Sequence, residues 1–568
     1  MSSRSSRRSF MKASVAAVPL SVALVAGASR RTGAESGCDA SGNADLVLSG
    51  GTLLTMDPAR PIAEAMAVRD GRILAVGSAE AIRHFTTPAT IVIDTHGLTV
   101  TPGFIDAHSH PLLFSEATGV NVGLPSIVEV QRALATKAAA TPPGHWVEGI
   151  MYDDTKFIER RPLTRLDIDA TVPDHPVMVR HRGGHTAVIN SRAFEIAGIT
   201  IDTPDPIGGK YYREGGAFTG KIAEKAVGSL RKIGTWPTED RASRARSAAI
   251  VLRRMAAAGL TSTTDALGTR DSFLAYQDAR AAGELWCRLS FMPDGGGDVY
   301  AGLKAAGVRS GFGDEMIRLG AVKFVADGSA SERTMRMSTP YSGRPDDVGI
   351  LTMDQKQIND AVDDAVANGF RVGIHANGDV TIEMVLNAYE RVLKHWQGAN
   401  PRLRIEHCSL VTPHIIKRIK AAGVIPAPFY TYAHYHGEKW AEYGVERMNW
   451  MFAHRSFLDA GIMVAPASDY PPGPFEPLMA LQSMVTRKDV AGRVWGERQR
   501  ITVDEVLRVC TMHGAYASFE ENLKGSLTPG KLADCVVLEH DPRAVDSDRI
   551  KDIRVLRTVL GGKTTYET

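Results

Sequence analysis

The chain has 568 residues, of which 44% are hydrophobic and 23% are charged, and its formal net charge is +2. These values are ordinary for a folded globular protein, so they exclude a disordered or fibrous chain and give no indication of a nucleic-acid partner. An α/β barrel alone takes up about 250 residues, so this length suits one large barrel with a smaller second domain.

The N-terminus has the pattern of a twin-arginine signal peptide over residues 1–28. Arg7 and Arg8 precede a short run of small apolar residues, and an A-x-A cleavage pattern ends at Ala28. Cleavage there removes four basic residues and no acidic one, which takes the formal charge from +2 to −2. We expect the twin-arginine machinery to export the folded protein to the periplasm or beyond. No second apolar run has the length of a membrane span, so no membrane association is expected after cleavage.

The cysteines do not form a recognisable framework. They show neither C-x-x-C spacing nor the density of a disulfide scaffold, so we expect mostly buried thiols. Oxidation of one pair in the periplasm stays open at this stage. The five residues are Cys38, Cys287, Cys408, Cys510 and Cys535.

After a linker at residues 29–43, the two ends of the chain have the same sequence pattern. Residues 44–100 and 520–568 consist of short β-like runs separated by turns. Within the first of them, Asp70-Gly71 separates two such runs and is a strong hairpin signal. We predict that the two ends fold together as one small β-sandwich-like domain.

Between these ends, over residues 101–475, short apolar runs alternate with helical patterns. Helices are predicted at 354–369 and at 412–422, and Gly423 follows the second as a C-terminal cap would. The pattern predicts a (β/α)8 TIM barrel with an insertion at about 111–250, followed by C-terminal barrel helices at 476–519. The eight runs are 99–110, 260–266, 287–292, 319–329, 371–379, 402–410, 423–430 and 461–470.

Polar side chains that bind metals recur at the carboxyl ends of the predicted strands, where barrels carry their functional groups. His108 and His110 point to the same side of their strand, because strand side chains alternate. Taken singly, such residues have ordinary alternatives: His407 as a hydrogen-bonded core histidine, and Asp469 as a cap or turn residue. Six convergent positions instead predict a metal centre. The set is His108, His110, Lys323, His375, His407 and Asp469.

Four imidazoles and a carboxylate are ligands suited to Zn²⁺, with Fe, Mn, Co or Ni left open. The set exceeds what a closed tetrahedral site needs, so it predicts two divalent metals, or one metal with open positions.

Six motifs of the chain together resemble the amidohydrolase superfamily and its family-3 branch, which includes N-substituted formamide deformylase-like proteins. They are "PGFIDAHSH", "VKFVADGS", "GIHANGD", "RIEHCS", "APASDYP" and "GSLTPGKLADCVVLEHDP". The resemblance implies that His108, His110 and Asp469 bind one metal ion and that His375 and His407 bind a second.

The resemblance also implies that a CO₂-derived carbamate on Lys323 bridges the two metals. A carboxylated lysine is an anionic oxygen donor, which an ammonium beside two metal ions is not. The alternative for an unmodified Lys323 is an ion pair with a nearby carboxylate such as Asp327.

The chemistry that the resemblance implies is metal-assisted hydrolysis of a carbon–nitrogen bond other than a peptide bond, in a small-molecule amide or N-acyl amine. Asp469 would orient the attacking water, take its proton and pass that proton to the leaving amine. His185, in the motif "RHRGGHTAVINSRAFEIAGI", matches a position that faces the substrate and would hydrogen-bond the developing oxyanion. The alternative is a loop histidine that packs the insertion on the barrel.

The seventh predicted strand is followed by aromatic residues and histidines. Phe429, Tyr432, His434 and His436 are candidates for a substrate pocket that accepts aromatic groups, and the alternative is that they stiffen an exposed loop.

Two other functions stay open: an ester or lactone hydrolase or a deaminase on the same scaffold, and a non-catalytic binding or scaffold protein. The sequence is also compatible with a homo-oligomer.

Overall fold

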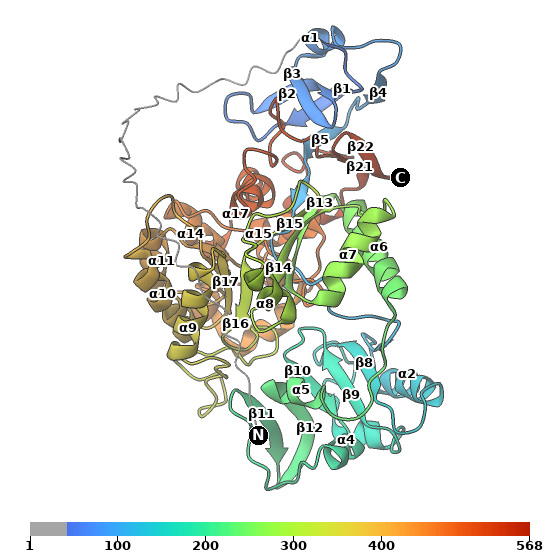
Figure 1. Cartoon of the computed structure of the whole chain (residues 1–568), viewed down its shortest axis with the longest axis vertical. Coiled ribbons are helices and arrows are strands. Elements are labelled where there is room, and N and C mark those ends of the chain that lie inside the picture. The colour runs from blue at the N-terminus through green and yellow to red at the C-terminus, as the bar shows by residue number, and fades with distance from the viewer. Residues whose placement is uncertain (1–41) are drawn as a thin grey trace, which may run out of the picture. The chain divides into compact units, whose positions relative to one another are not determined.

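The computed structural model describes residues 42–568 (Figure 1). The signal peptide predicted over 1–28, nearly all of the 29–43 linker and Cys38 lie outside these residues. Among residues 42–568 all four cysteines are buried free thiols, as predicted. No helix in this part of the chain combines the length and the apolar character that crossing a membrane requires.

The two ends of the described chain pair in one eight-stranded sheet. The link is the antiparallel pairing of β5 with β20, in which Val100 lies opposite Val537. Apolar residues from both ends, among them Leu48, Leu53 and Val559, form a common core. The strands are β1 (Leu46–Leu54), β2 (Ile62–Arg69), β3 (Arg72–Gly77), β4 (Ile91–Asp94), β5 (Thr99–Pro102), β20 (Cys535–Leu538), β21 (Val555–Leu560) and β22 (Lys563–Glu567), with helix α1 at Ala79–Arg83.

The hairpin predicted at Asp70-Gly71 joins β2 to β3. Asp70 has a φ of 52° and Gly71 a φ of 74°. Positive φ at both central residues is the geometry of a two-residue turn that matches the strand twist. A Cβ at Gly71 would lie 3.0 Å from the carbonyl oxygen of Gly561, so the close approach of the chain's two ends also favours glycine there.

The centre of the molecule is α/β, with two four-stranded parallel sheets. One has the order β15-β14-β13-β6 and the other β16-β17-β18-β19. Each of the first seven predicted runs contributes a strand. The strands are β6 (Phe104–Ile105), β13 (Leu260–Gly268), β14 (Arg288–Pro293), β15 (Ile317–Leu319), β16 (Val322–Val325), β17 (Val372–Ala376), β18 (Arg404–His407) and β19 (Ile425–Ala427).

The eighth predicted run, 461–470, is not a regular strand, and the prediction was wrong in this respect. Its backbone still bonds on both sides, since Ala107 N donates to Pro466 O at 2.8 Å and Ala465 N donates to Pro426 O at 2.9 Å. Pro466 lacks the N–H group that a regular ladder requires.

Helices flank the central sheets, and Figure 1 shows α9, α10 and α11 side by side next to β16 and β17. The predicted helices are confirmed as α9 and α11, and Gly423 caps the latter with a left-handed φ of 62°. The helices are α6 (Arg241–Ala257), α7 (Arg270–Ala281), α8 (Asp298–Ala305), α9 (Gln355–Ala367), α10 (Asp379–Leu393), α11 (Pro413–Ala422), α12 (Tyr432–Tyr435), α13 (Val445–Met448), α14 (His454–Asp459), α15 (Pro477–Thr486), α16 (Val503–Arg508) and α17 (Gly514–Ala517), with 3₁₀ helices at Gly437–Glu442, Glu497–Gln499 and Ser547–Asp552 and a π-helix at Val509–His513.

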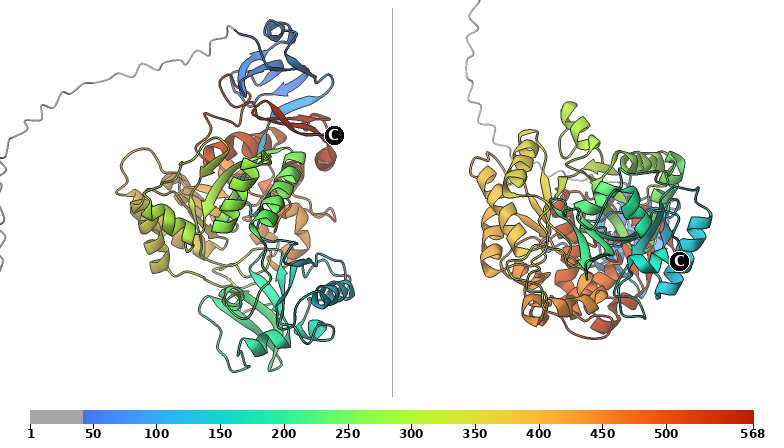
Figure 2. Two further views of the ribbon diagram at one scale, coloured as in Figure 1. Left: turned by 45° about the vertical axis from the view of Figure 1, so that its right-hand side comes forward. Right: turned by 90° about the horizontal axis from the view of Figure 1, so that it is seen from below.

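The insertion contains a sheet that the sequence did not predict. Figure 2 shows its strands and helices, in cyan and green, gathered together. Two apolar clusters, one around Leu134 and Val177 and one around Trp146 and Ile222, give it a core of its own. The elements are β7 (Val120–Asn121), α2 (Ile127–Ala139), β8 (Val147–Tyr152), α3 (Arg165–Asp169), β9 (Val177–His181), β10 (Thr186–Ile189), α4 (Ser191–Ile196), β11 (Gly209–Glu214), β12 (Ala217–Glu224) and α5 (Lys225–Leu230).

A buried ion pair ties the central sheets to the sheet of the chain ends, and it yields a first prediction. Arg288 on β14 forms two hydrogen bonds to Asp534, of 2.7 and 2.8 Å. Arg288→Met leaves the Asp534 carboxylate buried with only the N–H of Gly561, so we expect a loss of about 3–5 kcal/mol in urea unfolding followed by circular dichroism.

The exposed pair of Arg241 and Asp278 is the matched control. Arg241→Met should cost about 1 kcal/mol or less. Equal costs for the two variants would contradict the role assigned to Arg288.

Candidate metal centre

The six side chains predicted to bind metal converge on one buried region. They leave four strand ends and the segment after Ala467, and each is at most 9% exposed. His108 and His110 follow β6, Lys323 lies on β16, His375 on β17 and His407 at the end of β18, and Asp469 belongs to the eighth run. The convergence expected from parallel strand ends is therefore present.

The first half of the centre consists of His108, His110 and Asp469. Oδ1 of Asp469 lies 3.2 Å from Nε2 of His110 and 3.5 Å from Nε2 of His108. One ligand atom from each residue lies within 4.8 Å of the others, which is close enough for a single ion. Asp469 N also donates to His108 O at 2.9 Å, so the backbone fixes the two segments against each other.

Hydrogen bonds on the side away from Asp469 orient the imidazoles of His108 and His110. Nδ1 of His108 lies 2.6 Å from Glu406, whose carboxylate accepts two bonds from Arg404, and Nδ1 of His110 donates to Ala266 O. Burial, and then Lys323, lower the pKa of His108, so its ring is neutral. Nε2 of each histidine therefore faces Asp469, as metal ligation requires.

The second half consists of His375 and His407, whose ring centroids lie 4.4 Å apart. Nε2 of His375 donates to Gly328 O at 3.0 Å, so its lone pair is on Nδ1. Burial lowers the pKa of both rings well below the usual range, so both are neutral. Nδ1 of His407 is buried without a hydrogen-bond partner in the described part of the chain. A buried imidazole nitrogen of this kind fits a metal ion.

Lys323 lies between the two halves, with Nζ 3.2 Å from Nε2 of His108. Burial lowers the pKa of Lys323 to about 8, so a fraction of the amine is uncharged near neutral pH. The alternative ion pair with Asp327 is wrong, because Asp327 instead accepts the backbone N–H groups of Asn377 and Gly378, each at 2.9 Å. The donor set is thus one in which neutral nitrogens outnumber the single carboxylate.

His185 also reaches the centre, where its ring centroid lies 4.9 Å from that of His375. Nδ1 of His185 lies 2.8 Å from Glu224. Burial opposes protonation, but Glu224 outweighs it and raises the pKa of His185 to about 9, so the ring is a cation at neutral pH. Glu224 has a φ of 54°, a strained backbone for a residue with a side chain.

The aromatic residues after the seventh strand divide into two pairs. Phe429 stacks on His407 with centroids 4.5 Å apart, and Tyr432 donates to Oδ2 of Asp469 at 3.1 Å. These two are brought to the centre. His434 and His436 instead bond to the backbone carbonyls of Lys488 and Pro472, at 2.9 and 3.0 Å. All four are buried, so the alternative of an exposed loop is wrong.

Two residues of the site were missed in the sequence. Glu406 orients His108 and Glu224 orients His185. The motif "RIEHCS" contains the signal for the first, because a glutamate inside a buried strand requires a partner. Glu224 stands in a polar hairpin and has no such signal.

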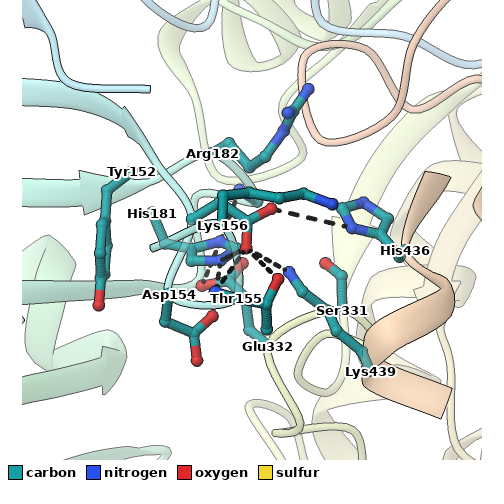
Figure 3. A network of polar contacts seen from close by, with 12 residues as sticks. Tyr152, Asp154, Thr155, Lys156, His181, Arg182, Ser331, Glu332, His436 and Lys439 are labelled. Atoms are coloured by element: carbon teal, nitrogen blue, oxygen red, sulfur yellow. Dashed lines mark hydrogen bonds and ion pairs between the residues drawn. The ribbon is translucent and has the colours of Figure 1, made fainter. Parts of the chain in front are cut away.

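A second polar cluster, shown in Figure 3, lies where the insertion meets the loops after β16 and β19. Asp153, Asp154 and His181 are spaced as metal ligands could be. However, Nζ of Lys439 lies 3.0 Å from Asp153, and Arg333 pairs with Asp154. Cations of the chain already offset these carboxylates, so the cluster acts as an ionic link between the insertion and the central sheets.

Comparisons with known proteins agree with this geometry. A model of the amidohydrolase family matches residues 91–566, which confirms the resemblance indicated by the six motifs. The chain is 31% identical over 543 residues to the N-substituted formamide deformylase of Arthrobacter pascens, covering 92% of this chain and 98% of that protein. It is 29% identical over 546 residues to the protein LONG AFTER FAR-RED 3 of Arabidopsis thaliana, covering 92% of each.

Solved structures share the fold. A metal-dependent hydrolase from Pyrococcus horikoshii superposes with a TM-score of 0.70 at 23% identity, over 88% of this chain and 99% of that one. A zinc-bound adenosine deaminase from Xanthomonas campestris superposes with a TM-score of 0.52 at 14% identity, over 92% and 93% of the two chains.

The hydrogen bond from His108 to Glu406 yields a second prediction. Glu406→Gln removes the charge that orients His108, so the affinity for zinc should fall about 10- to 100-fold in a titration against a chelating dye. Glu390 lies on α10 and pairs with Arg418 on α11, so Glu390→Gln is the matched control and should leave the affinity for zinc unchanged. Equal affinities in the two variants would show that Glu406 does not support the centre.

Proposed function

Since the chain belongs to the amidohydrolase family and is a hydrolase of carbon–nitrogen bonds, we propose that it cleaves a non-peptide amide or N-acyl amine. The observation that carries this proposal is the convergence of His108, His110, His375, His407, Lys323 and Asp469 in one buried region. The N-substituted formamide deformylase relative makes N-formyl amines the first substrates to test. No feature of the site favours an ester, a lactone or a deamination substrate over an amide, and the non-catalytic alternative is set aside.

We propose in addition that the two parallel sheets and the segment 461–470 are the wall of a single (β/α)8 barrel. Gly295 N donates to Lys323 O at 2.8 Å across the sheets, and the bonds of Ala107 and Ala465 support closure at the eighth run. The barrel would span 101–475 with helices at 476–519, and the small β-sandwich-like domain would comprise 44–100 and 520–568. The Pyrococcus horikoshii hydrolase supports the same fold.

Two divalent metals, zinc by preference, are proposed as cofactors. His108, His110 and Asp469 would hold the first, and His375 and His407 the second, with a carbamate on Lys323 between them. Burial supports the carbamate, because an uncharged amine is the form that reacts with CO₂. When bound, the metals would polarise the substrate carbonyl and make water acidic enough to attack near neutral pH.

Asp469 is proposed as the group that moves the proton. Its Oδ1 lies 3.2 Å from Nε2 of His110 and 3.5 Å from Nε2 of His108, where the first metal would bind. From this position the carboxylate could take a proton from the attacking water. Tyr432 donates to its Oδ2 and fixes the orientation in which Asp469 would pass that proton to the leaving amine nitrogen.

His185 is proposed to donate from Nε2 to the oxygen that becomes negative as the carbonyl carbon turns tetrahedral. Glu224 holds Nδ1, which leaves the other ring nitrogen free to face the substrate. A cation that is fixed before the reaction stabilises the developing charge without reorganisation.

Export by the twin-arginine machinery to the periplasm or beyond stays a prediction, because residues 1–28 lie outside the described part of the chain. The physical reason for it is that a centre loaded with metal and CO₂ before transport persists only if the protein crosses the membrane folded. A small-molecule amide is the expected partner, and an assembly of identical chains stays open.

The first test of the proposed function measures metal content and hydrolysis together. Elemental mass spectrometry should find two metal ions per chain, and amine release from N-formyl and N-acyl arylamines should require them. The double variant His108→Ala and His110→Ala should lose at least one ion and about 99% of the activity or more, because no other side chains replace these ligands. His414→Ala, on the exposed side of α11, is the matched control. Full metal loading in an inactive double variant would contradict the assignment of His108 and His110 as metal ligands.

The second test concerns His185. His185→Ala should lower kcat by about 10²–10³-fold with little change in KM or metal content, since it removes one donor to the oxyanion. Glu224→Gln should have a smaller effect of about tenfold, because a neutral amide still holds Nδ1 but no longer favours the cation. Loss of metal along with activity in His185→Ala would assign the residue a structural role instead.

A further inference from the structure

A cavity of about 350 Å³ lies between the insertion and the loop after β16. Its walls are residues of the strands β10, β11 and β12, the segment around Leu163, and the loop that contains Glu332 and Arg333. None of the six side chains of the metal centre lines it. Its volume is at the low end of the range for sites that bind small molecules, which is about 300–1,000 Å³.

Strand alternation builds the wall of this cavity. Val188 on β10 and Thr219 and Lys221 on β12 face the cavity, whereas Ile189 and Ile222 point into the core on the other side of the sheet. Tyr212 on β11 lines the cavity in the same way. The result is a mixed surface, with apolar side chains on both walls, one amine, and the charged side chains of Arg213, Arg333, Asp154, Glu214 and Glu332.

Most charged groups at the cavity already have partners. Arg333 pairs with Asp154, and Arg213 lies 2.9 Å from Asp205. Glu332 accepts hydrogen bonds from the backbone N–H groups of His185 and Thr186. These groups therefore have their charge or hydrogen-bonding capacity taken up by the protein.

Lys221 is different. Within the described residues its Nζ has no carboxylate oxygen within 4.0 Å and no hydrogen-bond acceptor, and it lies 4.8 Å from the centroid of the Tyr212 ring. The side chain is half-buried. Burial, and then Arg333, lower the pKa of Lys221 to about 8, while the carboxylates of Asp154 and Glu332 raise it without forming an ion pair with Lys221.

We propose that this cavity binds a small organic carboxylate with an apolar body. Lys221 forms the charged hydrogen bond to the carboxylate, and Leu163, Val188 and the ring of Tyr212 pack against the apolar part. An anion supplies the counter-charge that Lys221 lacks, and a hydrogen bond to a charged group contributes more than a neutral one. The site is separate from the metal centre and does not depend on the proposed hydrolysis.

The test uses benzoate as the probe and isothermal titration calorimetry on the full protein. Benzoate should bind once per chain, and Lys221→Met should weaken it at least tenfold, which follows from the loss of one charged hydrogen bond. Benzamide, which has the same shape without the charge, should bind at least tenfold more weakly than benzoate. Lys210→Met is the matched control, because Lys210 lies 5.0 Å from the same ring without lining the cavity.

A carboxylate also has affinity for metal ions, so the site must be located. Benzoate binding should persist in the His108→Ala and His110→Ala double variant, whether or not the proposed function is correct. Binding that survives Lys221→Met and disappears in the double variant would overturn the proposal, as would no detectable binding up to about 20 mM. Should Lys221→Met fail to fold, a crystal of the unmodified protein with 4-bromobenzoate decides: the bromine signal must lie in the cavity, with the carboxylate at Lys221.

Discussion

The structure depends on one electrostatic constraint, which is the burial of four imidazoles and a lysine around a single carboxylate. Burial keeps the rings of His108, His375 and His407 neutral, so their lone pairs are available. In a low-dielectric interior the lone pair of such a nitrogen can bind a proton or a metal ion. Burial disfavours the protonated ring, which leaves the metal ion as the partner. The parallel strands place these groups at one edge, where the proposed metal ions would meet the constraint.

The insertion adds His185 to the centre. The insertion itself is held in place by charge as well as by packing. Asp153 and Asp154 on the insertion pair with Lys439 and Arg333, which belong to segments following the central strands. Figure 3 shows Asp154 and Lys439 in this cluster. A buried ion pair contributes little net stability, because desolvation offsets the attraction. If the insertion were placed differently, however, these charges would be buried without partners, which costs about 3–5 kcal/mol. The network therefore fixes the position of the insertion, and with it the position of His185.

How far the sequence predicts this structure depends on the range of the interactions involved. His108 and His110 follow from strand alternation, and α11 with Gly423 follows from local capping, so both were predictable. The strand order of the insertion sheet was not, because β10 pairs with β12 and β8 with β9 across intervening segments that no local pattern encodes. Pro466 explains why the eighth run differs from a strand. Glu224 was missed because its role arises from a backbone turn at positive φ.

One hairpin of the insertion, β11 and β12, serves both the metal centre and the cavity. Lys221 and Tyr212 face the cavity, while Glu224, at the end of β12, holds His185. The strained φ of Glu224 ends the strand's alternation, and its N–H donates to His185 O at 2.7 Å, so the backbone and the side chain both fix that histidine. The strand ends determine the chemistry, which the family shares, whereas this hairpin presents the groups that a particular ligand meets. Changes in the hairpin should therefore alter selectivity and leave the metal ligands in place.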